Sequence, residues 1–298
     1  MKSPKIVFFG NEMLAQGIVS PITPAFEGLL ENGYTICALV LPSRTDSARS
    51  RNKRVFRVVE LAQKEDIPII YTDQETDLNS TLRNLKADVG VLSSFGRIVS
   101  QETIDIFPSG ILNIHPSLLP KYRGTTPIES AILNGDSETG VSVMALVAKM
   151  DAGPVYAQRK IALSGNETKD NVYEKLALLG AEMLLEIIPN MTNITPTAQN
   201  DSKASFTQKL DKSMSKLDAK NKSARELYNQ IRAFTGFPKS KLQINNLECV
   251  VTEAEVSDAK NTTLDQQCCD GKFLVIKKLV PPGKKEITAL DFINGYLR

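Results

Sequence analysis

The sequence predicts an α/β protein: a doubly wound, mostly parallel sheet, followed by a second domain built as a small antiparallel β-barrel. Short apolar strands alternate with helical patterns in residues 1–189, which is typical of a parallel sheet with helices on both faces. Beyond a polar stretch at 190–206, short strands are separated by turn signals, as in small barrels. A length of 298 residues also corresponds to about two domains.

In the first domain, apolar runs predict the strands and helical spacing predicts two helices. One helix is expected over 54–65, with Val58 and Ala62 on its apolar face, and a longer one over 169–188 that Pro189 ends. The turn after the first strand lacks the G-x-G-x-x-G pattern, which disfavours a dinucleotide cofactor. The expected strands are 5–9, 35–41, 68–71, 89–93, 111–115, 141–147 and 154–161.

The second half of the chain divides at a polar stretch. Residues 190–206, rich in Thr, Asn and Ser, are interpreted as a linker between a domain of 1–189 and a domain of 207–298. In the second domain we expect a helix over 223–234. The strands expected after it are 241–244, 247–256 and 272–280.

Composition and cysteine usage indicate an ordinary soluble protein. The chain is 42% hydrophobic and 23% charged, and no apolar run reaches the roughly 18 residues of a membrane span. The N-terminus reads as a strand instead of a signal peptide, so we expect a cytoplasmic protein with no membrane contact. The four cysteines form no C-x-x-C pattern and there is a single histidine, which argues against a metal site and against a disulfide framework.

The net charge of +2 conceals three basic segments. Residues 44–57 contain six basic residues and one acidic residue, and residues 203–222 and 272–298 each contain six basic and two acidic residues. Concentrated basic segments in a nearly neutral protein suggest a footprint for a polyanion. For any one segment taken alone, a solvated charged surface is an equally good explanation.

The stretch from Gly110 to Pro120 has the most informative chemical pattern. Its apolar residues alternate with Asn113 and His115, so both polar side chains lie on one face of a strand. An amide and an imidazole on the same face can act on one carbonyl group, because the amide donates to the oxygen while the imidazole handles a proton or a charge. The alternative is a buried histidine that hydrogen-bonds the backbone.

The sequence around this strand resembles that of the folate-dependent formyltransferases. The resemblance rests on Asn-Ile-His-Pro-Ser-Leu-Leu-Pro at 113–120, Tyr-Arg-Gly at 122–124 and Met-Asp-Ala-Gly-Pro around Asp151. It implies a catalytic trio of Asn113, His115 and Asp151, and 10-formyltetrahydrofolate as the donor of the formyl group. It further implies a Rossmann-like catalytic domain followed by an OB-like barrel.

The resemblance also implies where the folate lies. One set of contacts falls on the turn after the central strand, and a pterin pocket lined by backbone falls on the end of the preceding strand. For Phe95 and Leu118, core packing is an equally good interpretation. The implied folate-binding residues are Ser94, Phe95, Gly96, Ser117, Leu118, Leu119 and Pro120.

Two further motifs resemble those of the methionyl-tRNA formyltransferases: Gln-Ile-Arg-Ala-Phe at 230–234 and the ending that runs from Gly283 to Tyr296. In that family a basic loop between the second strand and the following helix reads the end of the initiator tRNA. The loop 42–53 matches in position and charge, and arginines there can neutralise phosphates. The residues expected to bind tRNA are Arg44, Arg49, Arg51, Lys53, Arg54, Lys203 and Lys209.

The sequence therefore predicts transfer of a formyl group from 10-formyltetrahydrofolate to the methionine α-amine of initiator Met-tRNA, by a monomeric enzyme without a metal. A sugar-nucleotide N-formyltransferase with the same folate donor is the nearest alternative. Three basic segments are less expected in such an enzyme than in one that binds tRNA. A tRNA-binding protein that has lost catalysis is a third possibility, against which the intact trio argues.

Overall fold

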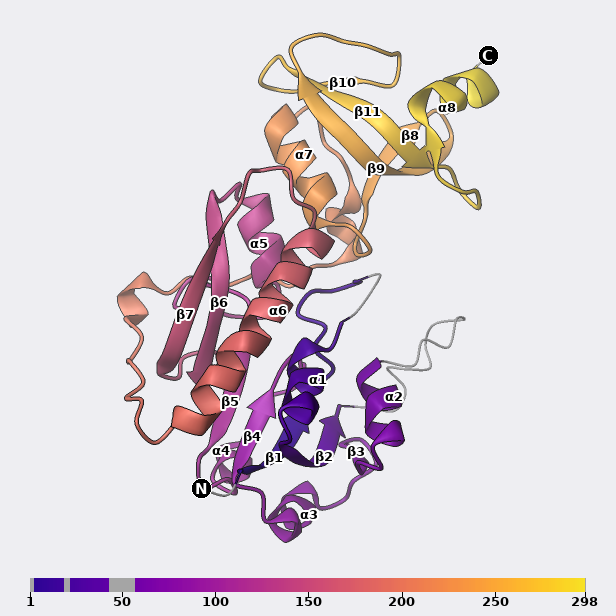
Figure 1. Ribbon diagram of the computed structural model, residues 1–298. Coiled ribbons are helices and arrows are strands. Elements are labelled where there is room, and N and C mark those ends of the chain that lie inside the picture. The colour runs from indigo at the N-terminus through magenta and orange to yellow at the C-terminus, as the bar shows by residue number, and fades with distance from the viewer. Residues whose placement is uncertain (1–2, 19–21, 43–56, 298) are drawn as a thin grey trace.

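In a computed structural model, the chain forms two sheets (Figure 1). The structure describes residues 3–18, 22–42 and 57–297. The strands of the first sheet are β1 (Lys5–Phe9), β2 (Thr35–Leu41), β3 (Ile69–Tyr71), β4 (Val89–Leu92), β5 (Ile111–His115), β6 (Glu138–Ala145) and β7 (Val155–Ala162). Within the described residues they lie in the order β3-β2-β1-β4-β5-β6-β7. The neighbours from β3 to β5 are parallel, whereas β6 and β7 are added antiparallel.

Helices cover both faces of this sheet, which confirms the predicted doubly wound fold. Ile6 and Phe8 of β1 lie in one core with α1 (Pro24–Glu31), α2 (Arg57–Lys64), α5 (Pro127–Leu133) and α6 (Lys169–Ile187). Val7 and Phe9 point to the opposite core, beneath α3 (Leu78–Leu85) and α4 (Gln101–Ile104). Because successive strand residues face opposite sides, a strand covered on both faces must be apolar throughout. This explains the uninterrupted apolar run of β1.

Several element boundaries differ from the prediction. β6 begins at Glu138 instead of 141, because its first residues pair with the far end of β7. α6 ends at Ile187, and Pro189 lies in a 3₁₀ turn over Ile188–Asn190, where proline is tolerated near a helical start. The predicted helix over 54–65 is described from Arg57 onward. The sequence analysis missed α1, α3, α4 and α5, as well as a helix over Ala289–Tyr296 in the second domain.

The second sheet is an antiparallel half-barrel. Its strands are β8 (Ser240–Ile244), β9 (Leu247–Ser257), β10 (Gln266–Gln267), β11 (Phe273–Val280) and β12 (Ile287–Thr288). In the described part of the chain the order is β10-β11-β9-β8, with β12 beside β11, so β8 and β10 are not paired with each other. The helices α7 (Ala224–Ala233) and α8 (Ala289–Tyr296) pack on its core through residues such as Leu227 and Phe292.

The boundaries of 1–189, 190–206 and 207–298 stay a prediction. Leu210, Ala233 and Phe234 pack in the core of the first sheet, although they follow the predicted linker. The stretch 190–206 is itself attached to the first sheet, since Thr197 exchanges two backbone hydrogen bonds of 2.8 Å with Val155. None of the helices in the described ranges combines the length and hydrophobicity needed to span a bilayer.

A buried ion pair joins the two parts of the molecule. Lys169 at the start of α6 and Glu129 in α5 are both fully buried, with 3.8 Å between Nζ and Oε1. The Lys169 ammonium donates to the carbonyl oxygens of Gln16 and Phe237, and the Gln16 N–H donates to Glu129 Oε1 at 3.1 Å. Burial lowers the pKa of Lys169 and raises that of Glu129, and each charge opposes the shift of the other. The pair thus fixes the loop at Gln16 in the first domain against the chain at Phe237, just before the strands of the second domain.

Removing one member of this pair should be costly. We expect Lys169→Met to lower the free energy of unfolding by about 3–5 kcal/mol, because it leaves a buried carboxylate without its cation. Lys169→Met combined with Glu129→Gln should recover much of that loss, since no unpaired charge remains. Urea denaturation of the three proteins measures both effects. If the double variant is less stable than the single one, the pair is not what stabilises this junction.

Glu12 is a second buried carboxyl group, in the loop after β1. It is 2% exposed, and its carboxylate oxygens accept the N–H groups of Ala25 at 2.9 Å and Phe26 at 2.8 Å in the first turn of α1. The first N–H groups of a helix have no partners within the helix, so Glu12 satisfies two of them. Burial nevertheless raises the pKa of Glu12 to about 8.

This shift predicts a pH dependence of stability. The pKa of Glu12 rises from the ordinary glutamate value of 4.5 to about 8 in the folded protein. Between these values the folded state binds more protons than the unfolded state, so stability falls as the pH rises. We expect the wild type to lose up to about 1.4 kcal/mol per pH unit between pH 5 and pH 8 relative to Glu12→Gln. Urea titrations at several pH values measure this difference, and parallel curves for the two proteins would contradict it.

Candidate functional site

The predicted polar residues of β5 lie where the parallel part of the sheet meets its antiparallel part. Asn113 is paired with Leu92 at the end of β4 on one side and with Met144 of β6 on the other. Asn113 and His115 are each only 5% exposed. Within the described parts of the chain, no hydrogen bond joins the Asn113 side chain to another residue. Asn113 is not among the described side chains with a fully buried, unpartnered polar atom, so its amide still reaches accessible surface, where it can meet a ligand.

The hydrogen bond of His115 determines which of its ring atoms is free. Nε2 lies 3.0 Å from the backbone oxygen of Tyr122. Because a carbonyl oxygen can only accept, Nε2 carries the hydrogen, and Nδ1 is the atom that gains or loses a proton. Nδ1 lies 3.8 Å from Oδ2 of Asp151, so a proton taken up there forms an ion pair with that carboxylate.

Asp151 reaches His115 from a loop outside the sheet. β6 ends at Ala145, which pairs with Leu112 of β5, and the loop then carries Asp151 back to His115. Asp151 has a backbone φ of +47°, in the left-handed region. Its Oδ2 accepts the N–H of Gly124 at 2.7 Å. The structure therefore brings together the three residues predicted to form the trio.

The turn after β5 contains the second group of predicted residues. Ser117 is fully buried, and its hydroxyl donates to the Lys121 carbonyl at 2.6 Å. Leu119 is held by two side chains: its N–H donates to Ser142 Oγ at 3.1 Å, and its carbonyl accepts from Gln158 at 2.7 Å. Ser117 and Leu119 thus fix the shape of the turn. Leu118 lies against Gly140, where a Cβ would come within 2.4 Å of its Cδ2, and Pro120 follows in a cis peptide.

The residues predicted for a pterin pocket follow β4. Ser94 and Gly96 have positive φ values of +55° and +70°, so the chain turns sharply at the end of the strand. A Cβ on Gly96 would have no atom within 4 Å, which leaves open space beside that backbone. Phe95 instead is 5% exposed and packs edge-on against Phe9 with ring centroids 5.6 Å apart. The Phe95 side chain therefore contributes to the core.

The residues predicted to bind RNA fall into two groups. Arg44, Arg49, Arg51, Lys53 and Arg54 lie outside the described residues. Lys203 and Lys209 are exposed and form no ion pair with another residue in the described ranges.

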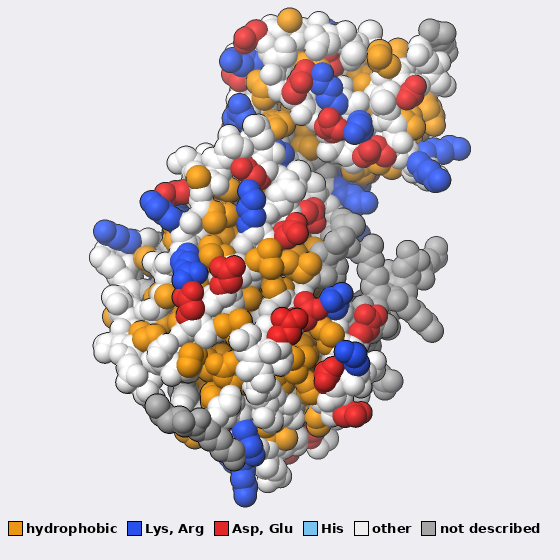
Figure 2. All heavy atoms as spheres, in the orientation of Figure 1, with side chains coloured by type: hydrophobic (Ala, Val, Ile, Leu, Met, Phe, Trp, Pro, Cys, Tyr) orange, Lys and Arg blue, Asp and Glu red, His pale blue; other side chains and the backbone are white. Residues whose placement is uncertain are grey.

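The C-terminal basic segment is partly neutralised by acidic residues of β9. Lys277 and Lys278 pair with Glu255 at 2.6 Å and with Glu253 at 2.7 Å. Figure 2 shows basic and acidic side chains next to each other over this domain. The lysines of 203–209 are thus more accessible to a polyanion than these paired ones.

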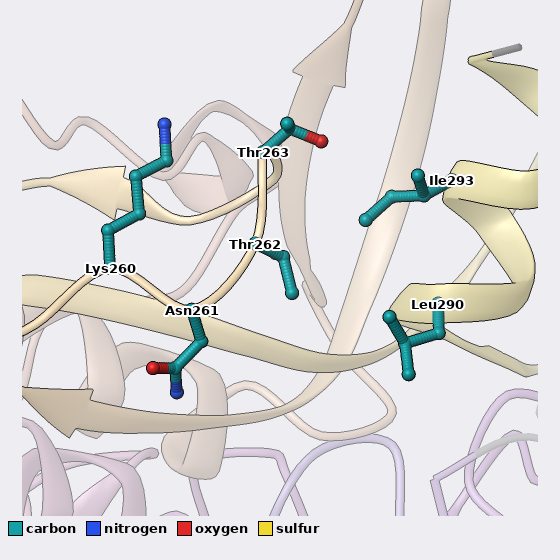
Figure 3. Close-up of a pocket in the computed structure, with 6 residues that line it drawn as sticks. All are labelled: Lys260, Asn261, Thr262, Thr263, Leu290 and Ile293. Carbon is teal, nitrogen blue, oxygen red and sulfur yellow. The ribbon is translucent and has the colours of Figure 1, made fainter.

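One pocket lies away from the trio. It belongs to the second domain, whereas the trio belongs to the first, and it is lined by Lys260, Asn261, Thr262, Thr263, Leu290 and Ile293 (Figure 3). Among the described residues, no group of three or more His, Cys, Asp or Glu side chains could hold a metal ion.

Sequence reasoning missed one residue of the site, Gln199, whose side chain donates to the backbone of Asp151 at 2.8 Å. Gln199 lies in the polar stretch interpreted as a linker, where nothing in the sequence singles it out. Arg123, by contrast, is suggested by its motif, and it is 1% exposed and hydrogen-bonded to Gln199.

Comparisons with known proteins agree with this geometry. Residues 14–188 match the formyl transferase family, and residues 209–297 match the formyl transferase C-terminal domain. A methionyl-tRNA formyltransferase of Methylococcus capsulatus is 30% identical over 307 residues, which cover 98% of this chain and 97% of that protein.

Solved structures show the same fold at lower identity. HypX from Aquifex aeolicus, in complex with tetrahydrofolic acid, has a TM-score of 0.67 at 17% identity; the match covers 100% of this chain, which spans 48% of HypX. An N-formyltransferase from Helicobacter canadensis, in complex with folinic acid and dTDP-3-aminofucose, has a TM-score of 0.68 at 19% identity, covering 93% and 99% of the two chains. Since two family models span most of the chain and the relative matches along its whole length, the chain belongs to the formyltransferase family, among the methionyl-tRNA formyltransferases.

Proposed function

We propose that the protein transfers the formyl group of 10-formyltetrahydrofolate to the α-amine of methionine on initiator Met-tRNA. The product is N-formylmethionyl-tRNA, which serves translation initiation. The observation that carries the proposal is the full-length similarity to a methionyl-tRNA formyltransferase, in a chain whose Asn113, His115 and Asp151 lie in one site.

The residues present fit a folate donor. The unpartnered amide of Asn113 offers a hydrogen-bond donor for a carbonyl oxygen, and the backbone turn at Ser94–Gly96 has open space beside it. Ser117 and Leu119 also shape the turn after β5. The residues that we propose for folate binding are Ser94, Phe95, Gly96, Ser117, Leu118, Leu119 and Pro120. HypX, which has the same fold, was solved in complex with tetrahydrofolic acid, and this supports a folate as the donor. The folate supplies the formyl group.

Each member of the trio has a role that its geometry supports. The Asn113 amide donates to the formyl oxygen as negative charge develops there, and a preorganised donor of this kind contributes ~100–1,000-fold in rate. His115 offers Nδ1 for proton exchange, because its Nε2–H donates to the Tyr122 carbonyl. Asp151, 3.8 Å from Nδ1, balances the charge of that proton.

The acceptor is assigned as a tRNA because a basic segment adjoins the site. Residues 205–207 lie beside Arg123. The Arg123 N–H donates to the Ser205 carbonyl and the Arg123 carbonyl accepts from the Thr207 N–H, both at 2.8 Å. The next residue, Gly124, donates to the carboxylate of Asp151. The exposed Lys203 and Lys209 flank this segment. A tRNA presents phosphates along its whole backbone, whereas a nucleoside diphosphate sugar presents two, so an extended basic surface favours the tRNA. The arginines of 44–54 are proposed to extend this surface on the strength of their charge.

A single assay tests the function. The protein is incubated with 10-formyltetrahydrofolate and, separately, with initiator Met-tRNA, free methionine and an amino-sugar nucleotide. We expect formyl transfer to Met-tRNA alone. Transfer to the amino-sugar nucleotide would replace the proposal by the sugar-nucleotide alternative, and no transfer to any acceptor would leave an RNA-binding protein.

Substitutions in the trio should separate catalysis from binding. We expect Asn113→Ala and Asp151→Ala to lower kcat by about 100-fold or more, because both groups act on charge that develops in the transition state. The affinity for tRNA and the melting temperature should stay close to those of the wild type. Asn190→Ala, in the 3₁₀ turn after α6, is the matched control. Turnover close to wild type in either trio variant would contradict the assignment.

The lysines beside the site should contribute to RNA affinity in a salt-dependent way. Replacing Lys203 and Lys209 with Ala should weaken tRNA binding and reduce the slope of log K against log salt by about one to two, because fewer counterions are released. Lys277→Ala with Lys278→Ala removes the same charge from residues that already pair with Glu255 and Glu253, and should change the slope less. Equal slopes for the two double variants would show that only net charge matters.

A further inference from the structure

The position of Asp151 needs an explanation beyond the sheet. Asp151 lies in the loop between β6 and β7, and the last paired residues of that hairpin are Met144 and Val155. No ladder of strand hydrogen bonds therefore holds it. Its φ of +47° is also unfavourable for a residue with a side chain, and such conformations persist only where the surroundings impose them.

The surroundings include one side chain that binds the loop on both sides of Asp151. Gln199 Nε2 donates to the Asp151 carbonyl at 2.8 Å and to the Gly153 carbonyl at 2.7 Å. An amide nitrogen has two hydrogens, and both are used here. Gly153 itself lies so close to β6 that a Cβ would come within 1.9 Å of the Ala145 oxygen. The loop is thus fixed between β6 and the Gln199 amide.

Arg123 determines the orientation of that amide. Its Nε and Nη2 donate to Gln199 Oε1 at 3.1 Å and 2.7 Å. A guanidinium only donates and the two loop carbonyls only accept, so the reversed amide would lose all of these hydrogen bonds. Arg123 is 1% exposed, and its charge is balanced by Asp201, which accepts from Nη2 at 2.7 Å and from Lys149 at 2.6 Å.

These contacts close a ring around Asp151. Arg123 reaches its backbone through Gln199, while the next residue, Gly124, donates to its side chain at 2.7 Å. Gln199 and Asp201 come from the segment that connects the two domains, which passes outside β7 (Figure 1). The connecting segment therefore completes the site instead of only joining two folded units.

We infer that Gln199 is a positioning residue for the formyl transfer, which holds the Asp151 loop so that the carboxylate faces His115; this inference rests on the proposed function. Gln199 does not touch the reacting groups. Its effect passes through the backbone of Asp151, so it determines the turnover of bound substrates and not their affinity. A misplacement of about 1 Å at a catalytic group can cost ~100-fold in rate.

Two variants of Gln199 test the inference in the full-length protein. Gln199→Ala removes all four hydrogen bonds. Gln199→Glu keeps an oxygen for Arg123 but loses both donors to the loop. We expect each to lower kcat with Met-tRNA by about 10- to 100-fold, with both KM values within about twofold of the wild type. Asn200→Ala is the matched control, because the Asn200 side chain bonds only Ser202 among the described residues. Its kcat should stay within about twofold of the wild type.

A double variant adds a readout that a merely structural role would not change. In the Asp151→Ala background, Gln199→Ala should cause no further loss of kcat, because its effect passes through the missing carboxylate. Wild-type turnover in Gln199→Glu, a rise in KM without a fall in kcat, or an independent loss in the double variant would overturn the inference. If the wild-type protein formylates no acceptor, the proposed function fails; if it is active and both Gln199 variants match it, only this inference fails. Melting temperatures identify a variant that has not folded, and the other variant then decides.

Discussion

The site depends on one constraint: a carboxylate must be held against His115 by a loop that the sheet does not hold. In a parallel sheet, groups at the ends of neighbouring strands are brought together by strand pairing itself. Asn113 and His115 are placed in that way, since β5 is paired on both sides. Asp151 is not placed in that way, because the chain leaves the sheet after Ala145, the last residue of β6, and the loop that follows has to fold back toward His115. Side chains therefore take over the role of strand hydrogen bonds, and the Arg123–Gln199 arrangement is the result.

The same difference decides what the sequence could predict. Alternation within β5 placed Asn113 and His115 on one face without any further knowledge, because two-residue periodicity follows from strand geometry. Asp151 needed the resemblance to a family, since an aspartate before Ala-Gly-Pro is otherwise a common turn residue. Nothing in the sequence identified Gln199 as a residue of the site. Its partners Arg123 and Asp151 are 76 and 48 residues away, and a polar stretch has no periodicity from which contacts can be inferred. The missed helices α1, α3, α4, α5 and α8 have eight residues or fewer, which gives about two turns or less in which an apolar period can show.

Buried ionisable side chains in this molecule are found next to loops. Glu12 binds the first turn of α1, Lys169 and Glu129 bind the loop at Gln16, and Arg123 reaches the loop of Asp151 through Gln199. A loop buried against a core has backbone groups that no ladder satisfies, and an unsatisfied group costs free energy. An ionisable side chain offers several donors or acceptors at once, so a single residue can satisfy two or three such groups. The loops that adjoin the site are thereby given defined conformations.

The connecting segment combines two properties that are usually separate. Gln199 holds the backbone of Asp151, and Lys203, a short distance along the same segment, presents an exposed charge. Asp201 lies between them and contacts both Arg123 and Lys149, and hydrogen bonds from these two residues lower its pKa, so it stays ionised. The residue that holds the backbone of Asp151 and a lysine proposed to contact the acceptor therefore lie within one short stretch of chain, so the proposed acceptor surface directly adjoins the site.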